Sequence, residues 1–241
     1  MDKMNKNLTE YKALVFDLDG TLYYQRRLRI KMAWMLFTYY LCHFFRIKEV
    51  FVIKKFREVR EHWDEIKTGM PEAGAAGRDD GAGLEEIQYK YLADKMHLSS
   101  DEVRDVIETW MYDKPLKAVY ETRDTDLLGM IEDVKKRGQK VFIFSDYPIE
   151  DKLNALGLSA DGMYAATDER LNELKPSPKG LKLIMEDHGL KPDEILMVGD
   201  RMSRDGMAAE NAGCDYLILP KTKEGRKKIF KKFCYFQKIV L

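Results

Sequence analysis

Two aspartates near the start of the chain stand where a run of apolar residues ends. The segment from Lys12 to Tyr24 reads KALVFDLDGTLYY, so Asp17 and Asp19 follow closely on the apolar run ALVF. Burying a carboxylate is costly unless a cation or hydrogen-bond donors meet it. The pattern therefore predicts a site in which something cationic meets these two side chains.

Five short apolar runs have the composition of buried β-strands. They are rich in Val, Ile, Leu, Phe or Tyr and occupy residues 13–16, 141–144, 163–166, 195–198 and 216–219, the third being the weakest. Helical patterns, most of them followed by a glycine, lie between the later runs at residues 126–137, 149–156, 178–188 and 204–212. Alternating strands and helices predict an α/β fold whose parallel sheet is covered on both faces.

Polar residues gather just beyond these predicted strands. Ligands of open parallel sheets bind beyond the carboxyl ends of the strands, so residues placed there are candidates for chemistry. Besides Asp17 and Asp19, the candidates are Thr21, Ser145, Asp146, Lys175, Asp200 and Asp205. Carboxylates, hydroxyls and one lysine are therefore expected to meet at one edge of the sheet.

These residues occur in four motifs that resemble those of the haloacid dehalogenase (HAD) superfamily. The motifs follow one another in the order DLDGT (17–21), the Ser that ends FIFS (145), the Lys of LKPSP (175) and GDRMSRD (199–205). The resemblance covers roughly residues 11–22 and 116–220, and it implies a Rossmann-like core. The expected domains are a catalytic core of residues 1–22 and 116–241, with a basic tail at 221–241, and an inserted α-helical cap of the C1 type at 23–115.

The segment between the first two predicted strands has helical rather than strand patterns. An apolar stripe with a 4-3-4-3 spacing runs through Val52, Phe56, Val59, Trp63 and Ile66. Residues 99–102, SSDE, form a capping box ahead of a second apolar pattern. The glycine-rich stretch 69–83 is interpreted as a mobile loop.

The resemblance implies a role for each candidate residue. Asp17 is the expected nucleophile, forming an aspartyl-phosphate, and Asp19 is the expected general acid and base. Mg²⁺ is the expected cofactor, bound by Asp17, the backbone carbonyl of Asp19 and Asp200, with Asp205 helping to hold the site. The phosphoryl group is expected to be bound by Thr21, Ser145, Asp146 and Lys175. Asp146 departs from the family pattern, since relatives commonly carry Asn after the Ser.

A Mg²⁺-dependent phosphatase acting on a small phosphorylated metabolite is the function that this pattern favours. The resemblance implies that the dehalogenases and phosphonatases of the superfamily lack an acid at the position of Asp19. The leaving alcohol of a phosphate ester requires such an acid because it must be protonated. A phosphomutase uses the same motifs and stays open as an alternative. So does an interaction protein that uses the fold as a scaffold. The four histidines share no metal-like spacing and are interpreted as structural or surface residues.

The net charge of zero conceals two basic blocks. Residues 25–60 contain ten Lys or Arg against two Glu, and residues 221–241 contain eight against one. Aromatic residues interleave with these charges, which suggests peripheral contact with a membrane through residues 26–60 and 221–241 as one hypothesis. The other interpretation, which the pattern favours, is internal packing. The uncharged stretch 32–45 is too short to span a bilayer and is expected to form a buried helix in the cap or a homodimer interface. The apolar stripe of the tail is expected to lie on the core, and no nucleic-acid motif accompanies the charge.

The start of the chain and its cysteines favour a cytoplasmic protein. The first twelve residues are polar and lack the apolar segment of a signal peptide. The three cysteines are scattered and form no C-x-x-C pair, which suits a reducing compartment and argues against a disulfide framework or a structural zinc.

Overall fold

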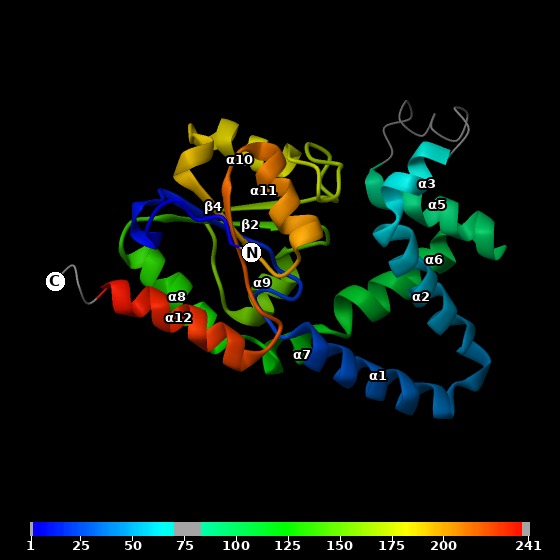
Figure 1. Cartoon of the computed structure of the whole chain (residues 1–241). Coiled ribbons are helices and arrows are strands. Elements are labelled where there is room, and N and C mark those ends of the chain that lie inside the picture. The colour runs from blue at the N-terminus through cyan, green and yellow to red at the C-terminus, as the bar shows by residue number, and fades with distance from the viewer. Residues whose placement is uncertain (1, 70–82, 238–241) are drawn as a thin grey trace. The chain divides into compact units, whose positions relative to one another are not determined.

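The chain forms two compact units in the computed structural model, which describes residues 2–69 and 83–237 (Figure 1). One unit comprises Met1–Leu28 and Val119–Leu241, and the other comprises Arg29–Ala118. We call these the core unit and the helical unit. The two boundaries fall six and three residues further along the chain than the sequence-based bounds at 22 and 115.

A five-stranded sheet in the order β3-β2-β1-β4-β5 forms the centre of the core unit, and every neighbouring pair is parallel. The strands are β1 (Ala13–Phe16), β2 (Lys140–Ser145), β3 (Gly162–Ala165), β4 (Ile195–Gly199) and β5 (Asp215–Ile218). Each predicted strand, including the weak third one, is present within one residue at either end. The strand that precedes the aspartates therefore lies in the middle of the sheet.

Helices cover both faces of the sheet because successive side chains of a strand point to opposite sides. Leu14 and Phe16 pack in a core that α8, α9 and α12 complete, whereas Ala13 and Val15 pack in a second core with α10 and α11. Figure 1 shows α8 and α12 on one side of the sheet and α10 and α11 on the other. The helices are α7 (Leu116–Glu121), α8 (Thr125–Lys136), α9 (Glu150–Leu156), α10 (Lys179–His188), α11 (Met207–Ala212) and α12 (Lys223–Gln237), with short η1 (Leu8–Glu10), η5 (Pro192–Glu194) and η6 (Met202–Gly206). The predicted α/β class is confirmed.

The helical unit is built as the sequence predicts, from helices alone in its described part. Val52, Phe56, Val59 and Trp63 are buried, but the predicted stripe is divided between two helices by a break at His62. The capping box of Ser99 and Glu102 is present, and the glycine-rich stretch falls almost wholly at 70–82, outside the described residues. The elements are α1 (Gln25–Cys42), which begins in the core unit, η2 (Phe44–Arg46), α2 (Lys48–Glu61), α3 (Trp63–Gly69), α5 (Leu84–Met96), α6 (Ser100–Ile107) and η4 (Glu108–Asp113).

The prediction that residues 32–45 form a helix buried within the cap is wrong, whereas its alternative, a helix in a homodimer interface, stays a prediction. Met32 and Tyr40 are buried, but Trp34, Phe37 and Leu41 are exposed by 67%, 56% and 64%. The reason is that this helix is apolar on opposite sides and only one of those sides finds a packing partner. No helix in the described ranges is long and apolar enough to cross a membrane.

The prediction that the tail packs on the core is confirmed as far as side chains are described. Phe230 is buried in the core that contains β1, and Ile229 packs beside it. The apolar side chains beyond residue 230 lie outside the described part.

Two helical glycines provide a matched test of how tightly the core is packed. A Cβ at Gly180 in α10 would lie 2.5 Å from the ring of Phe144, a fully buried residue of β2, whereas a Cβ at Gly129 in α8 would meet nothing within 4 Å. We expect Gly180→Ala to lower the free energy of unfolding by about 1–3 kcal/mol through overpacking. Gly129→Ala should raise it by roughly 0.5–1 kcal/mol through backbone entropy. Urea denaturation measures both, and a stabilising Gly180→Ala would contradict the packing described here.

Candidate active site

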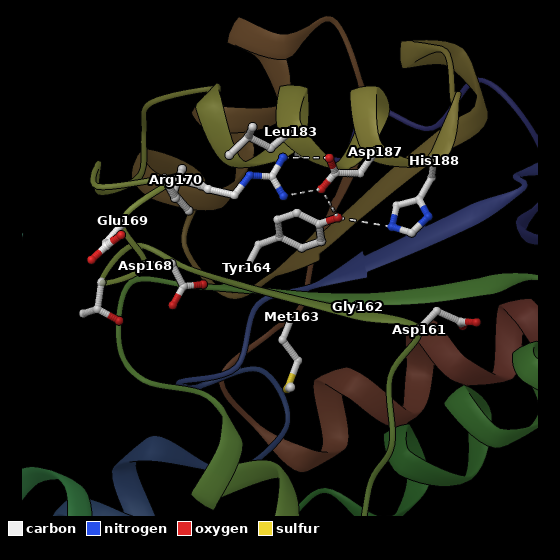
Figure 2. Close-up of a pocket in the computed structure, with 12 residues that line it drawn as sticks. Asp161, Gly162, Met163, Tyr164, Asp168, Glu169, Arg170, Leu183, Asp187 and His188 are labelled. Carbon is white, nitrogen blue, oxygen red and sulfur yellow. Dashed lines mark hydrogen bonds and ion pairs between the residues drawn. The ribbon is translucent and has the colours of Figure 1, made fainter.

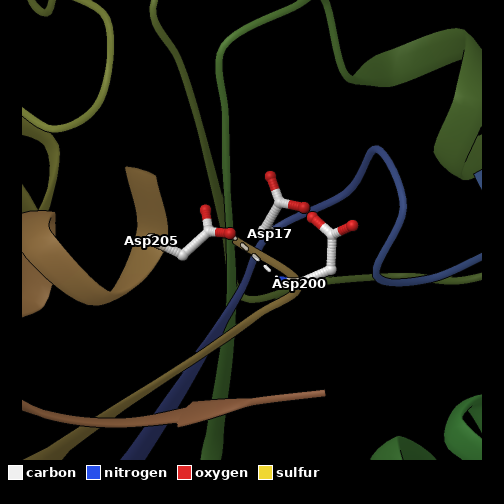
Figure 3. Close-up of side chains that lie close together, drawn as sticks. All are labelled: Asp17, Asp200 and Asp205. Carbon is white, nitrogen blue, oxygen red and sulfur yellow. Dashed lines mark hydrogen bonds between the residues drawn. The ribbon is translucent and has the colours of Figure 1, made fainter. Parts of the chain in front are cut away.

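Three buried carboxylates meet where β1 and β4 end (Figure 3). Asp17 follows β1, Asp200 follows β4, and Asp205 comes from the helical turn η6. One oxygen of each lies within 4.8 Å of the others. The parallel register that pairs Phe16 with Val198 brings the two strand ends to the same edge, so the sheet itself assembles this acidic cluster.

Glycines in two of the motifs make this close approach sterically feasible. Gly20 has a φ of +100°, and a Cβ there would lie 2.7 Å from Oδ2 of Asp200. A Cβ at Gly199 would collide with the side chain of Asp205. Both positions therefore require glycine because a carboxylate of the site occupies the space beside them.

Lys175 supplies a cation in the interior of the cluster. Its side chain is buried, and Nζ donates hydrogen bonds to Oδ1 of Asp17 at 2.5 Å and to Oδ1 of Asp205 at 2.7 Å. The backbone N–H of Lys175 donates to Oδ1 of Asp146 at 2.8 Å, so the acid that departs from the family pattern anchors the loop carrying the lysine. Thr21 donates to the other oxygen of Asp17 at 2.8 Å. Lys175 of the LKPSP motif therefore joins the DLDGT motif, through Asp17, to the GDRMSRD motif, through Asp205.

The electrostatics of the cluster show that one lysine does not neutralise it. Burial raises the pKa of Asp17 well above its ordinary value, Lys175 opposes this rise, and the carboxylates of Asp205 and Asp200 add to it. Burial also raises the pKa of Asp200, and Asp205 raises it further. Burial by itself lowers the pKa of Lys175, but Asp17 and Asp205 raise it above the ordinary value. A further cation would favour the ionised form of all three acids.

The residues present fit a hard divalent cation such as Mg²⁺. Oδ1 of Asp200 is buried and has no hydrogen-bond partner among the described residues, which is costly for a carboxylate oxygen unless a ligand meets it. Oδ2 of Asp205 accepts hydrogen bonds from the backbone N–H groups of Asp200 and Arg201 at 3.1 and 3.0 Å, so this residue braces the loop that carries Asp200. Carboxylate oxygens are the ligands that Mg²⁺ prefers. The described residues contain no other such cluster of metal-binding side chains.

The side chain of Asp19 has partners of its own outside the acidic cluster. Nζ of Lys152 donates to its two oxygens at 2.7 and 3.0 Å, and the hydroxyl of Tyr23 donates to Oδ1. Ser145 lies at the same place, with Oγ 3.5 Å from Oδ2 of Asp19 and accepting from the backbone N–H of Tyr147 at 3.0 Å. The side chain of Asp19 is therefore fixed beside the cluster by donors of its own.

Sequence reasoning missed Lys152, although a signal was available. In α9, Ile149, Leu153 and Leu156 define the buried face, and Lys152 falls on that same face and is itself buried. A lysine on the apolar face of a helix needs a carboxylate partner. The helix directly follows the motif that ends in Ser145, which places this lysine near the sheet edge.

Arg226 is the second functional residue that the sequence did not reveal. Its buried guanidinium donates to the backbone carbonyls of Gly20 and Thr21 at 2.5 and 2.7 Å and to Oδ2 of Asp124 at 2.9 Å. It also lies over the ring of Tyr24 at 4.8 Å. Helix α12 thereby fixes the loop that follows Asp17 from behind. No motif surrounds this arginine, so the sequence contained no signal for it.

A separate pocket of about 760 Å³ lies along the edge strand β3 (Figure 2). Two of its charged lining residues pair with each other: Arg170 forms an ion pair with Asp187 at 2.7 Å, and Tyr164 donates to Asp187 at 2.9 Å. Burial and the Asp187 carboxylate raise the pKa of Tyr164 to about 12. His188 contacts the Tyr164 hydroxyl and packs against Phe142 with its ring tilted by 34°, in keeping with the structural role expected for it. This internally paired network provides no acidic cluster and no convergent set of donors.

The structure defines an α/β protein with a parallel sheet and a cluster of buried aspartates at the ends of its central strands. A family model described as haloacid dehalogenase-like hydrolase matches residues 11–213. The chain belongs to this family, and the resemblance carried by the four motifs is confirmed.

Proteins named as phosphatases and proteins named as dehalogenases are both similar to the chain. The phosphoglycolate phosphatases of Vibrio vulnificus and Vibrio parahaemolyticus are 52% identical to it over 42 residues, a stretch that covers 17% of this chain and 18% of each of those proteins. Among solved structures, a predicted phosphoglycolate phosphatase from Haemophilus somnus matches with a TM-score of 0.53, 20% identity and coverage of 89% and 87% of the two chains. A 2-haloacid dehalogenase from Pseudomonas syringae matches with a TM-score of 0.51, 16% identity and coverage of 87% and 86%. At these identities, the structures show a shared fold.

Replacing Arg226 should destabilise the chain far more than replacing its neighbour. Arg226→Met removes the donor to Oδ2 of the buried Asp124 carboxylate and to three backbone carbonyls, those of Gly20, Thr21 and Pro220, so we expect a loss of about 3–5 kcal/mol in the free energy of unfolding. Lys227→Met, at an exposed position of the same helix, is the control and should change it by less than about 0.5 kcal/mol. Thermal and urea denaturation measure both variants. Equal effects would show that the buried contacts of Arg226 do not stabilise the fold.

Proposed function

We propose that this protein is a Mg²⁺-dependent phosphatase that hydrolyses a small phosphorylated metabolite through an aspartyl-phosphate on Asp17. The observation that carries the proposal is the pairing of the buried acidic cluster with a second acid, Asp19, two residues from the nucleophile and held by partners of its own. The first group fits metal and phosphate, and the second fits proton transfer. Their separation suits a reaction that needs both.

The nucleophile is prepared by its neighbours. Thr21 and Lys175 each donate to one oxygen of Asp17, which fixes the carboxylate and favours its ionised form. Asp17, Asp200, Asp205 and the backbone carbonyl of Asp19 would hold the Mg²⁺ ion, which when bound supplies positive charge against the repulsion between carboxylate and phosphate. Attack by an oxygen of Asp17 on phosphorus forms the aspartyl-phosphate, and the substrate alcohol departs. Lys175, Ser145, Thr21 and the Asp146 segment are the proposed contacts for the phosphoryl oxygens.

Asp19 would serve both halves of the reaction. It would give a proton to the departing alcohol and then accept one from the water that cleaves the aspartyl-phosphate, help worth roughly 10²–10⁴ in rate. Lys152 and Tyr23 hold its side chain in one orientation. Tyr23 donates a hydrogen bond to Asp19. Burial raises the pKa of the Tyr23 hydroxyl, so this hydroxyl keeps its proton.

The acid at position 19 also favours a phosphate ester over a haloacid as substrate. A halide leaves without a proton, and the resemblance implies that the dehalogenases lack this acid. The Vibrio relatives are named for phosphoglycolate, which makes 2-phosphoglycolate the first substrate to assay. A phosphomutase would use the same residues, and a sugar phosphate incubated with the enzyme distinguishes the two by whether inorganic phosphate or an isomeric ester forms. No turnover of any phosphate ester would favour the scaffold hypothesis.

Substitution of the two acids should separate their roles. Asp17→Asn should abolish turnover of phosphate esters because no carboxylate remains to attack. Asp19→Asn should slow turnover by roughly 10²–10⁴-fold while leaving Asp17 able to react. Asp133→Asn, in an exposed ion pair of α8, is the matched control and should retain full activity. If Asp17→Asn keeps a sizeable fraction of the wild-type rate, the covalent mechanism is wrong.

Metal binding should be visible without any substrate. Mg²⁺ at about a hundredfold excess over its Kd should stabilise the wild type by roughly 2.7 kcal/mol in thermal unfolding, and a chelator should remove both this gain and the activity. Asp200→Asn should unfold without metal at the same temperature as the wild type or higher, since it removes a buried charge whose pKa is raised. It should show no gain on addition of Mg²⁺. An equal gain in both proteins would place the ion elsewhere.

A further inference from the structure

Helix α1 carries an exposed stripe of large apolar side chains. Ile30, Trp34, Phe37 and Leu41 are exposed by 64%, 67%, 56% and 64%. At 3.6 residues per turn these four positions fall within an arc of about 60°. Met32 and Tyr40, the buried residues of the helix, lie outside this arc. The stripe is therefore a continuous face that stays exposed among the residues that the structure describes.

The apolar face continues beyond the end of α1. Phe44 and Phe45 in η2 are exposed by 61% and 78%, and Ile47 and Phe51, one helical turn apart at the start of α2, are exposed by 49% and 59%. We call these four residues and the stripe together the apolar face. Soluble monomers rarely expose so many large apolar residues in one stretch of chain unless something binds there.

Cationic residues border the apolar face. Arg26 and Arg27, at the start of α1, fall on either side of the arc, and Lys48 lies on the turn of α2 before Phe51; all three are exposed. Lys54 and Lys55, also exposed, follow Phe51 and form ion pairs with Glu58. Over residues 25–60 the formal balance is ten cations against two anions. An aromatic-rich stripe edged by Lys and Arg is the composition of helices that lie in the interface of an anionic membrane.

The charge selects among the partners that could cover such a face. A second copy of the chain would bring two strongly cationic surfaces together, which mutual repulsion disfavours. An anionic lipid surface offers apolar depth for the Trp and Phe side chains and negative charge for the flanking cations, each worth about tenfold or less in affinity. No described helix is long and apolar enough to span a bilayer, so the contact that fits these helices is with the membrane surface.

We propose that the apolar face of α1, η2 and the start of α2 binds the surface of an anionic lipid bilayer, with the stripe inserted among the acyl chains near the headgroups. The binding is peripheral and reversible, and it is independent of the chemistry at Asp17. It places the helical unit on the lipid.

The arrangement of tryptophans gives a direct assay on the whole chain. Of the three, Trp34 is exposed, whereas Trp63 and Trp110 are buried. Titration with phosphatidylcholine vesicles containing phosphatidylserine should shift the Trp34 emission to the blue. Brominated lipids should quench it. Raised salt should weaken the binding, and vesicles of phosphatidylcholine alone should bind at least tenfold more weakly.

Two double variants test the apolar face and its bordering cations, and both keep Trp34 as the fluorescent reporter. Phe37→Ser with Leu41→Ser leaves Trp34 in place and should weaken vesicle binding by at least about tenfold. Met163→Ser, an equally exposed apolar residue of the core unit, is the control and should bind as the wild type does. Arg26→Glu with Lys48→Glu exchanges one polar group for another, so it tests the charge contribution without altering apolar packing, and it should abolish the preference for anionic vesicles.

Three results would overturn the proposal. The first is no blue shift with anionic vesicles at low salt. The second is equal binding to anionic and neutral vesicles. The third is a dimer in solution that Phe37→Ser with Leu41→Ser converts to a monomer, because a second copy would then be the occupant of the face. Asp17→Asn protein should bind vesicles like the wild type, so the outcome does not depend on the proposed phosphatase activity.

Discussion

The buried ammonium of Lys175 is the interaction on which the candidate site depends. It lies between Asp17, which follows β1, and Asp205 of η6, which follows β4, and without it three buried carboxylates would face one another. The backbone N–H of Lys175 donates to Asp146, which follows β2. A single residue thereby links the segments that follow β1, β2 and β4. Because three acids meet one lysine, negative charge is left over that a divalent ion could neutralise.

The contrast between Asp17 and Asp19 shows how neighbouring residues of one type acquire different tasks. Asp17 shares its cluster with other acids, a lysine and a threonine, whereas Asp19 has a lysine and a tyrosine as partners. The backbone turn at Gly20, which only glycine adopts comfortably, lets the loop pass close to Asp200. Two aspartates separated by one residue thus have different partners, as the proposed roles of nucleophile and general acid–base require.

The strands and the meeting of the motif residues at one sheet edge could be predicted from the sequence because short local patterns encode them. Strand runs ended within a residue of their predicted bounds, and the motif residues met at one edge because parallel strands place their carboxyl ends together. Lys152 was within reach of the same reasoning, since its place on an apolar helix face requires an acid. Arg226 was not, because its partners are distant in sequence: two backbone carbonyls more than two hundred residues away and the carboxylate of Asp124. The exposure of Trp34 and Phe37 was mispredicted because an apolar run of that length is compatible with burial, and periodicity alone cannot say whether a partner exists.

The position of β1 has a consequence for the order in which the protein can form during synthesis. Its two neighbours in the sheet begin at Lys140 and Ile195, and the loop after it receives its last donor from Arg226. The helical unit, residues 29–118, leaves the ribosome before any partner of β1 has been made. A nascent chain must therefore carry an unpaired central strand while the inserted unit folds, and parallel pairing over such distances is slow. The inserted unit, by folding early, shortens the effective separation between the strand and its partners.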